Sequence, residues 1–283
     1  MNATEIKSGL GLPTIRITSS TNWLALRLSE LWDYRELLYF FVWRDVKVRY
    51  KQTAIGAAWA IIQPLLTVVA FTVIFDRFAK MPSDGLPYPV FSYAALLPWN
   101  YFASSLNRSI GSVVEGANLI TKVYFPRLLL PISATVSGLI DFTISFIFLL
   151  IMIAWYGIIP TWGALLLPCF ILLAMLTALS VGLWLSVLNV RYRDVGQAIP
   201  FLIQIWLFAS PVAYPVSVVP EKWRALYSLN PMAGVIEGFR WALLGKQLPD
   251  IASIVISIVV VLLLVVGGII FFKRMENTFA DVV

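Results

Sequence analysis

The sequence predicts an all-α integral membrane protein with six transmembrane helices, and three observations support this fold class. Hydrophobic and aromatic residues make up 60% of the 283 residues. Charged residues make up only 13%, about half of the roughly 25% that is usual in soluble domains. Five windows without any charged residue are each long enough for the about 20 apolar residues with which a helix crosses a bilayer.

One of these windows, residues 142–190, is too long for a single span. Gly, Pro, Tyr and Trp interrupt it at residues 156–163, a composition typical of a turn at a membrane interface. Its first half extends back past Asp141 to Pro131. The predicted helices lie at about 56–75, 90–113, 131–157, 163–189, 197–214 and 251–272, within a membrane domain of residues 54–275.

An even number of spans places both termini on one side of the membrane, and the basic residues indicate which side. Of the 21 Lys and Arg residues, 14 lie on the side of the termini, six lie on the opposite side, and Arg108 lies inside a span. Because positive charge accumulates on the cytoplasmic side, we expect a multi-pass protein of the cytoplasmic (inner) membrane with cytoplasmic termini. Residues 1–30, which lack the apolar core of a signal peptide, and residues 276–283 are predicted to be cytoplasmic tails. The basic charge balance then reflects topology, and no nucleic-acid partner is expected.

The absence of certain residues excludes several kinds of enzyme. There is no histidine, and Cys169 is the only cysteine. Histidine acid–base catalysis, His/Cys zinc sites and Cys/His nucleophile pairs are therefore excluded. The nearest match to a phosphate-binding loop, residues 238–247, has six residues between its glycines instead of four and lacks the Ser or Thr that would hold magnesium. We expect no catalytic residues, no metal and no bound cofactor in this chain.

Two charged residues, Arg108 and Asp141, fall inside predicted spans. A single carboxylate makes a weak proton relay, so the pattern does not favour an ion-coupled carrier. Because a lone charge in lipid is costly, the two side chains either pair with each other or line a hydrated path.

Residues 31–53 precede the first span and are predicted to form an amphipathic helix in the cytoplasmic interface. Apolar residues recur with helical spacing on one face, and charged residues gather on another. The helix is either a simple membrane anchor or a surface on which a soluble partner docks. The first face carries Tyr39, Val42, Trp43, Val46 and Tyr50, and the second carries Asp33, Glu36, Arg44, Lys47 and Lys51.

A further apolar stretch, residues 223–245, is too interrupted to span the membrane. Asn230 and Pro231 break it, and it carries charged residues, among them Glu237 and Arg240. Two short helices that re-enter the outer leaflet would fit, because irregular backbone at membrane depth is tolerated where protein or a hydrated cavity surrounds it. An amphipathic hairpin on the membrane surface fits the pattern equally.

Five short segments stand out in order along the chain. They are residues 43–53 (WRDVKVRYKQT), 56–64 (GAAWAIIQP), 97–99 (LPW), 118–127 (NLITKVYFPR) and 191–194 (RYRD). Together they closely resemble the membrane subunit of type-2 ABC exporters for polysaccharides, in particular the permeases for O-antigen, capsule and teichoic acid chains. The resemblance extends from about residue 30 to the C-terminus.

This resemblance implies a homodimer joined by two copies of a separate ATPase subunit, which would bind ATP and magnesium. The substrate would be a lipid-linked, O-antigen-like polysaccharide. The helix before the first span would lie at the membrane interface, two cytoplasmic connections would couple to the ATPase, and a re-entrant hairpin would form an outer gate. The residues that match these roles are Trp43, Arg44, Lys47 and Arg49 in the helix, Asn118, Lys122, Phe125, Pro126, Arg127, Arg191, Arg193 and Asp194 in the connections, and Trp223, Asn230, Pro231, Glu237 and Arg240 in the gate.

Aromatic residues in or near the spans have two interpretations. In the first, they form belts at the membrane interface or face lipid, as most such residues do. In the second, some of them face a pore and stack on the apolar faces of sugar rings. The candidates for a pore surface are Trp59, Trp99, Trp206 and Phe208.

Three other functions remain as alternatives. A type-2 ABC exporter of drugs or small lipids would share the fold and differ in the chemistry of its pore. A membrane-embedded glycosyl- or acyltransferase would need a catalytic base or an acidic cluster, which a chain without histidine and with one intramembrane carboxylate does not favour. A passive channel would conduct without any ATPase partner.

Overall fold

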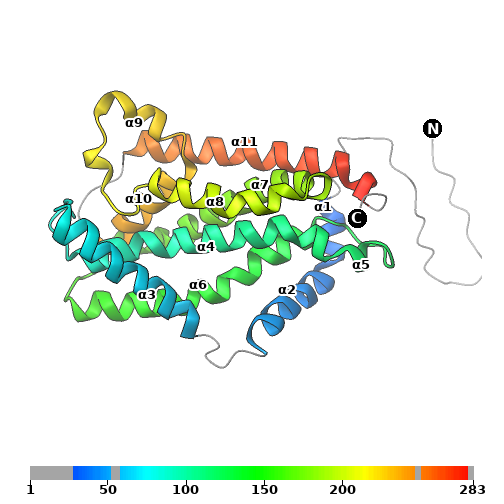
Figure 1. Ribbon diagram of the computed structural model, residues 1–283, viewed down its shortest axis with the longest axis horizontal. Coiled ribbons are helices and arrows are strands. Elements are labelled where there is room, and N and C mark those ends of the chain that lie inside the picture. Colours follow the sequence, from blue (N-terminus) through cyan, green and yellow to red (C-terminus); the bar gives the residue numbers. More distant parts are fainter. Residues whose placement is uncertain (1–27, 52–57, 246–249, 280–283) are drawn as a thin grey trace, which may run out of the picture.

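The computed structural model of the protein describes residues 28–51, 58–245 and 250–279. Within these residues every regular element is helical and no strand is present, so the predicted all-α class is confirmed. The long helices run side by side along the long axis of the molecule (Figure 1). Residues 1–27 of the first predicted tail and 280–283 of the second lie outside the described residues, and so do residues 52–57, which end the predicted interface helix and begin the first predicted span.

Helices cover most of each predicted span. They are α3 (Trp59–Phe71), which continues as a π-helix (Thr72–Phe78), α4 (Tyr88–Glu115), α6 (Leu129–Trp155), α7 (Leu167–Arg191), which follows a 3-10 turn (Trp162–Leu166), α8 (Asp194–Phe208) and α11 (Ile251–Met275). The shorter helices are α1 (Leu28–Asp33), α2 (Arg35–Tyr50), α5 (Ala117–Ile120), α9 (Glu221–Tyr227), α10 (Pro231–Leu244) and the 3-10 turns Val216–Val218 and Glu276–Thr278.

Four helical stretches are long and apolar enough to cross a membrane: Ile61–Phe78, Leu129–Trp155, Trp162–Arg191 and Ile251–Met275. Helix α4 has 28 residues and is about 42 Å long at 1.5 Å per residue. It carries serine, asparagine and arginine and is therefore less apolar than these four stretches. Helix α8 is apolar but has only 15 residues.

The fifth predicted span, residues 197–214, differs from the structure at its end. Helix α8 ends at Phe208, and residues 209–212 form turns. Pro211 explains this ending, because proline has no backbone N–H and its ring disfavours helical backbone at Ser210. The expectation that this helix reaches residue 214 is therefore wrong.

Helix α4 forms the centre of the bundle and packs mainly against α6 and α7. Its Tyr93 and Phe102 are fully buried. Small residues allow the neighbouring helices to approach closely, since a Cβ atom on Gly182 of α7 would lie 2.3 Å from Oγ of Ser109. Protein thus covers the buried serines of α4, which explains how a helix of this composition lies among apolar helices.

The two ends of the bundle contain different parts of the chain (Figure 1). Helices α1 and α5 and the C-terminal end of α11 gather at one end, on the right in Figure 1. Helices α9 and α10 lie at the opposite end. The connections predicted to be cytoplasmic and the hairpin predicted to be external are therefore separated by the length of the bundle.

Candidate functional site

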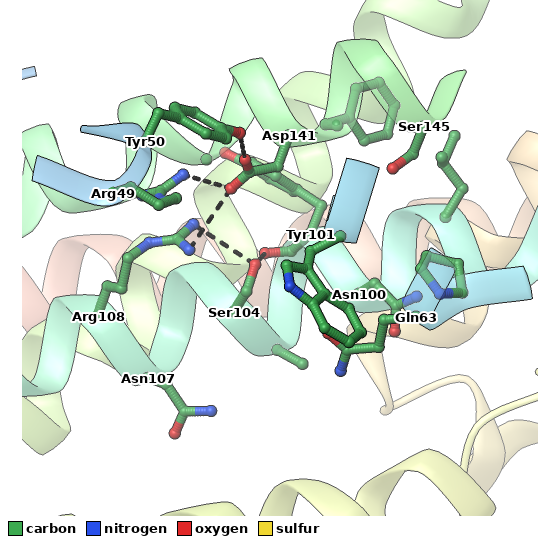
Figure 2. Close-up of a pocket in the computed structure, with 16 residues that line it drawn as sticks. Arg49, Tyr50, Gln63, Asn100, Tyr101, Ser104, Asn107, Arg108, Asp141 and Ser145 are labelled. Carbon is green, nitrogen blue, oxygen red and sulfur yellow. Dashed lines mark hydrogen bonds and ion pairs between the residues drawn. The ribbon is translucent and has the colours of Figure 1, made fainter. Parts of the chain in front are cut away.

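A cluster of charged side chains joins α2, α4 and α6 (Figure 2). Asp141 of α6 accepts hydrogen bonds from the Arg49 guanidinium and from the Tyr50 hydroxyl, both in the last turn of α2. Arg108 of α4 approaches the same carboxylate, with its Nη1 atom 3.8 Å from Oδ2. The two charges predicted inside spans thus meet, and α2 supplies a second arginine.

The contacts of Arg49 and Tyr50 fasten the end of α2 to α6. Arg49 also donates to the hydroxyl and to the carbonyl oxygen of Ser137, at 3.3 and 3.5 Å. Burial and the Asp141 carboxylate raise the pKa of the Tyr50 phenol to about 12, so the phenol stays protonated and donates. Hydrogen bonds to an ionised carboxylate are stronger than those between neutral groups, so α2 is held firmly against α6.

The contacts of Arg108 are longer. Its guanidinium donates to the hydroxyls of Ser104 and Ser105, each at 3.4 Å, and its Nε donates to the Ala134 carbonyl oxygen at 3.4 Å. Gly138 makes room for this side chain, because a Cβ atom there would lie 2.5 Å from Arg108 Nη2. The Arg108 guanidinium is therefore positioned by neutral groups and only loosely by the carboxylate.

The cluster lines a cavity of about 420 Å³ between α2, α3, α4 and α6. Arg108 and Asp141 approach each other to 3.8 Å, and both side chains line this cavity. With a single carboxylate, the lining does not offer a set of metal ligands. Apart from the charged cluster, the polar lining residues are Gln63, Asn100, Tyr101, Ser104, Asn107 and Ser145, and Trp59 contributes an aromatic ring.

Most of α2 is on the surface of the described chain. Phe41 is its buried residue and packs edge-on against Phe125, with 5.4 Å between ring centroids. Tyr39 and Trp43 are 71% and 55% exposed and point away from the protein, whereas Tyr50, on the same predicted face, contacts Asp141. Of the other residues predicted for this helix, Arg44 pairs with Asp45 at 2.8 Å, Lys47 is exposed, and Arg49 turns toward Asp141.

The connection between α4 and α6 has an exposed tip and a buried base. Asn118 and Lys122 are exposed, whereas Phe125 and Pro126 are buried. Tyr124 is also exposed, and its hydroxyl lies 3.4 Å from Oε1 of Glu30 in α1. The tip is therefore the part of this connection that is open to a partner.

Arg127 links this connection to the C-terminal end of the described chain. Its backbone N–H donates to Oε1 of Glu276 at 3.1 Å, and its guanidinium lies 6.0 Å from the centre of the Phe279 ring. Phe279 packs edge-on against Phe272 of α11, with 5.2 Å between centroids. No local sequence signal indicated this contact, because it joins segments about 150 residues apart.

The turn between α7 and α8 exposes Arg191, Arg193 and Asp194. Buried Asn189 holds this turn, because its Oδ1 accepts from the N–H of Gly196 at 2.9 Å and its Nδ2 donates to a backbone carbonyl of α4 at 3.2 Å. The sequence analysis missed Asn189. Its signal was an isolated amide at the end of a charge-free window.

The four aromatic residues proposed for a pore surface lie in different environments. Trp99 is 3% exposed and packs against Trp206, with 6.4 Å between ring centroids. Trp59 and Phe208 are 52% and 55% exposed. The structure therefore places Trp99 in the core and leaves Trp59 and Phe208 on the surface of the chain.

The interrupted apolar stretch forms an exposed helix, α9, followed by a buried helix, α10. Trp223 of α9 is 51% exposed. Asn230 caps α10, since its side chain accepts from the N–H of Met232 at 3.1 Å and from Nε1 of Trp206 at 3.0 Å. Pro231 is the first residue of α10, where its missing N–H leaves no helical bond unmade.

Arg240 anchors α10 to the turn that ends α8. It is 7% exposed, and its guanidinium donates to the carbonyl oxygens of Val212 at 2.7 Å and of Tyr214 at 3.3 Å. The guanidinium also stacks on the Phe91 ring, 3.6 Å from its centre. Glu237, one turn earlier, is half-buried. Arg240 is therefore a packing residue that fixes the end of the bundle opposite to α5.

The apolar helices define the chain as a multi-pass membrane protein. Residues 36–244 match the family model described as ABC-2 type transporter, and the chain belongs to this family. The resemblance predicted from five sequence segments is confirmed.

Individual relatives are transport proteins. The chain is 32% identical to the O-antigen export system permease protein RfbA of Myxococcus xanthus over 223 residues, 78% of this chain and 85% of that protein. It is 27% identical to a protein of the same name from Klebsiella pneumoniae over 252 residues, 88% of this chain and 95% of that protein. It is 23% identical to the polysialic acid transport protein KpsM of Escherichia coli over 218 residues, 75% of this chain and 82% of that protein.

Proposed function

We propose that this chain is the pore-forming membrane subunit of an ATP-driven exporter of a lipid-linked, O-antigen-like polysaccharide. The observation that carries the proposal is the similarity to permeases named for O-antigen export over 78% and 88% of the chain. The relative named for polysialic acid transport supports the same class of substrate. ATP binding and hydrolysis belong to a separate partner subunit, and this chain has no enzymatic role.

The proposed topology has six spans, with α4 and α8 added to the four apolar helices. Helix α4 is long enough, and its polar residues pack against α6 and α7. Helix α8 covers about 22 Å, and the turns after it extend the same segment. The excess of basic residues at one end supports cytoplasmic termini and an inner-membrane location.

The partner ATPase docks on two exposed connections, in a complex of two copies of each chain. One connection is the tip at residues 118–124, and the other is the turn at residues 191–194. Arginine in the second connection suits a docked partner, because guanidinium groups hold carboxylates or carbonyl oxygens in a fixed geometry. In this arrangement α2 lies in the membrane interface with Tyr39 and Trp43 toward the headgroups.

Transport follows from movement of these connections. Each lies at the end of a long helix, α4 or α7, so a displacement caused by ATP binding shifts the bundle of each protomer. A path opens along the two-fold axis of the homodimer, and α9 with α10 closes its outer end. The glycan passes stepwise, because binding must be weak enough to release at each step.

The test is to purify the full chain with and without a candidate partner ATPase and to reconstitute both in vesicles. We expect a stoichiometric complex in which ATP hydrolysis requires both proteins and lipid-linked glycan accumulates on the far side of the membrane. A catalytically inactive ATPase variant is the matched control. If the chain alone conducts solutes or transforms the glycolipid, the exporter proposal is wrong.

A further inference from the structure

The cavity between α2, α3, α4 and α6 contains more positive than negative charge. Two arginines, Arg49 and Arg108, share the single carboxylate of Asp141. Asp141 is engaged mainly by Arg49 and Tyr50, and Arg108 lies 3.8 Å from it. The remaining contacts of Arg108 are 3.4 Å long and go to neutral oxygens. An incompletely neutralised guanidinium at such a site favours entry of an anion.

The groups around this guanidinium differ from those of a purely structural ion pair. Gln63, Asn100 and Asn107 bring amide donors and acceptors to the lining of the same cavity, and Figure 2 labels all three among its residues. The Trp59 ring, 52% exposed, lies at the wall contributed by α3. Amides beside an aromatic ring suit sugar hydroxyls and the apolar face of a sugar.

The position and size of the cavity limit what it can hold. Asp141 lies about 18 Å along α6 from Leu129, so the charged cluster is well inside the bundle. A volume of about 420 Å³ is within the range of small-molecule sites. A volume of this size accommodates a phosphoryl group with one attached sugar.

We propose that this cavity binds the phosphoryl group, mono- or diphosphate, that joins a lipid carrier to the first sugar of a glycan. Arg108 and Arg49 contact the phosphoryl oxygens, since a guanidinium presents two parallel N–H groups that match them. Gln63, Asn100 and Trp59 contact the adjoining sugar. The proposal rests on the proposed export function and deepens it, because the permease then recognises the lipid-proximal end of its substrate and not only the repeating glycan.

The test measures binding directly, without ATP. The full chain, in complex with its ATPase, is placed in phosphatidylcholine nanodiscs and titrated calorimetrically with geranylgeranyl diphosphate, with uncharged geranylgeraniol and with inorganic diphosphate. We expect the diphosphate lipid to bind at least about tenfold more tightly than the alcohol, and Arg108→Gln to remove most of this difference. Arg77→Gln removes a positive charge from an exposed site outside the cavity and should leave the difference in affinity between the diphosphate lipid and the alcohol unchanged.

A second variant tests the site without changing its charge. Gly138→Ala brings a methyl group within 2.5 Å of Arg108 Nη2 and of Ser105 Oγ, so the guanidinium must shift, and binding of the diphosphate lipid should weaken about tenfold. It therefore gives an answer even if Arg108→Gln does not fold. If inorganic diphosphate binds as tightly as the diphosphate lipid, the cavity is an anion site for soluble phosphates. If the diphosphate lipid binds more tightly than inorganic diphosphate, the site belongs to the headgroup of the lipid-linked substrate.

Either of two results overturns the proposal: equal affinity of the wild type for diphosphate lipid and alcohol, or undiminished binding in both cavity variants. ATP-dependent glycan export is measured on the same wild-type complex in vesicles. Export without diphosphate binding means that the cavity proposal alone is wrong. Absence of a complex with the ATPase, or of export, means that the proposed function is wrong.

Discussion

The guanidinium of Arg49, in the last turn of α2, donates a hydrogen bond to the carboxylate of Asp141 in the middle of α6. The two residues are 92 positions apart in the sequence. Through this contact a helix that precedes the first span is fixed to the core of the bundle. The position of α2 is thereby connected to the cavity between α2, α3, α4 and α6.

Replacing Asp141 should detach the end of α2. Asp141→Asn weakens the bonds from Arg49 and Tyr50 and leaves two arginines without their carboxylate, so we expect a loss of about 2–3 kcal/mol in the free energy of unfolding. The measurement is the thermal unfolding midpoint of the purified protein in detergent. Asp45→Asn is the control, because Asp45 pairs with its neighbour Arg44 inside α2 and its contact with Ser133 of α6 is a long one of 3.4 Å, so it should contribute less than about 1 kcal/mol. Equal effects of the two variants would contradict the anchoring role of Asp141.

The charged cluster around Asp141 shows which features of the fold and the site could be predicted from the sequence. Charge-free windows predicted the long helices, because the bilayer imposes length and composition on each span. The two charges Arg108 and Asp141 could be singled out for the same reason. The partners Arg49 and Tyr50 could not, since their helical spacing assigns them to a surface helix and only tertiary packing brings them to α6.

Other features of the site were hidden for related reasons. Arg240 is a basic residue in a broken apolar stretch, a pattern that fits a hydrated surface as well as a buried anchor. Its role follows from the carbonyl oxygens of Val212 and Tyr214, which are free to accept because Pro211 ends α8 early. The link between Arg127 and Phe279 likewise depends on where the chain returns after α11.

Glu276 should couple the C-terminal end of the chain to the connection between α4 and α6. In Glu276→Ala the backbone N–H of Arg127 loses its acceptor, so the connection is held less firmly. We expect the complex still to hydrolyse ATP but to export several-fold less glycan per ATP. Glu276→Gln retains an acceptor oxygen and should behave almost as the wild type. If Glu276→Ala exports as much glycan per ATP hydrolysed as the wild type, the contact between Glu276 and Arg127 does not contribute to coupling.

Asn230 should determine how firmly α10 is seated. Asn230→Ala removes the N-cap and the acceptor of Trp206, with an expected loss of about 1–2 kcal/mol of stability. Asn230→Asp keeps the oxygen that accepts from Met232 and Trp206 and loses the Nδ2 donor to Ala209 and Ser210, so its stability should lie between those of Asn230→Ala and the wild type. Thermal unfolding of the three proteins gives the comparison. A cap role for Asn230 is excluded if Asp is as destabilising as Ala.

Arg191 and Arg193 should contact the ATPase by hydrogen bonds that require the planar guanidinium group and not only its positive charge. The double variant Arg191→Lys/Arg193→Lys keeps both charges and hence the positive-inside signal, but lysine cannot make two parallel bonds to one carboxylate. We expect normal accumulation in the membrane, weaker co-purification of the ATPase and several-fold less export. Full export by the double variant would mean that charge alone matters at this turn.

Trp59 and Trp99 should respond oppositely to replacement by alanine. Trp99 is 3% exposed and packs against Phe102 and Trp206, so Trp99→Ala should destabilise the bundle by about 3–5 kcal/mol and lower the amount of folded protein. Trp59 is 52% exposed and lines the cavity, so Trp59→Ala should leave the amount of protein nearly unchanged and reduce export. Export normalised to the quantity of folded protein separates the two effects. If normalised export by Trp59→Ala equals that of the wild type, the Trp59 ring faces lipid and takes no part in binding the glycan.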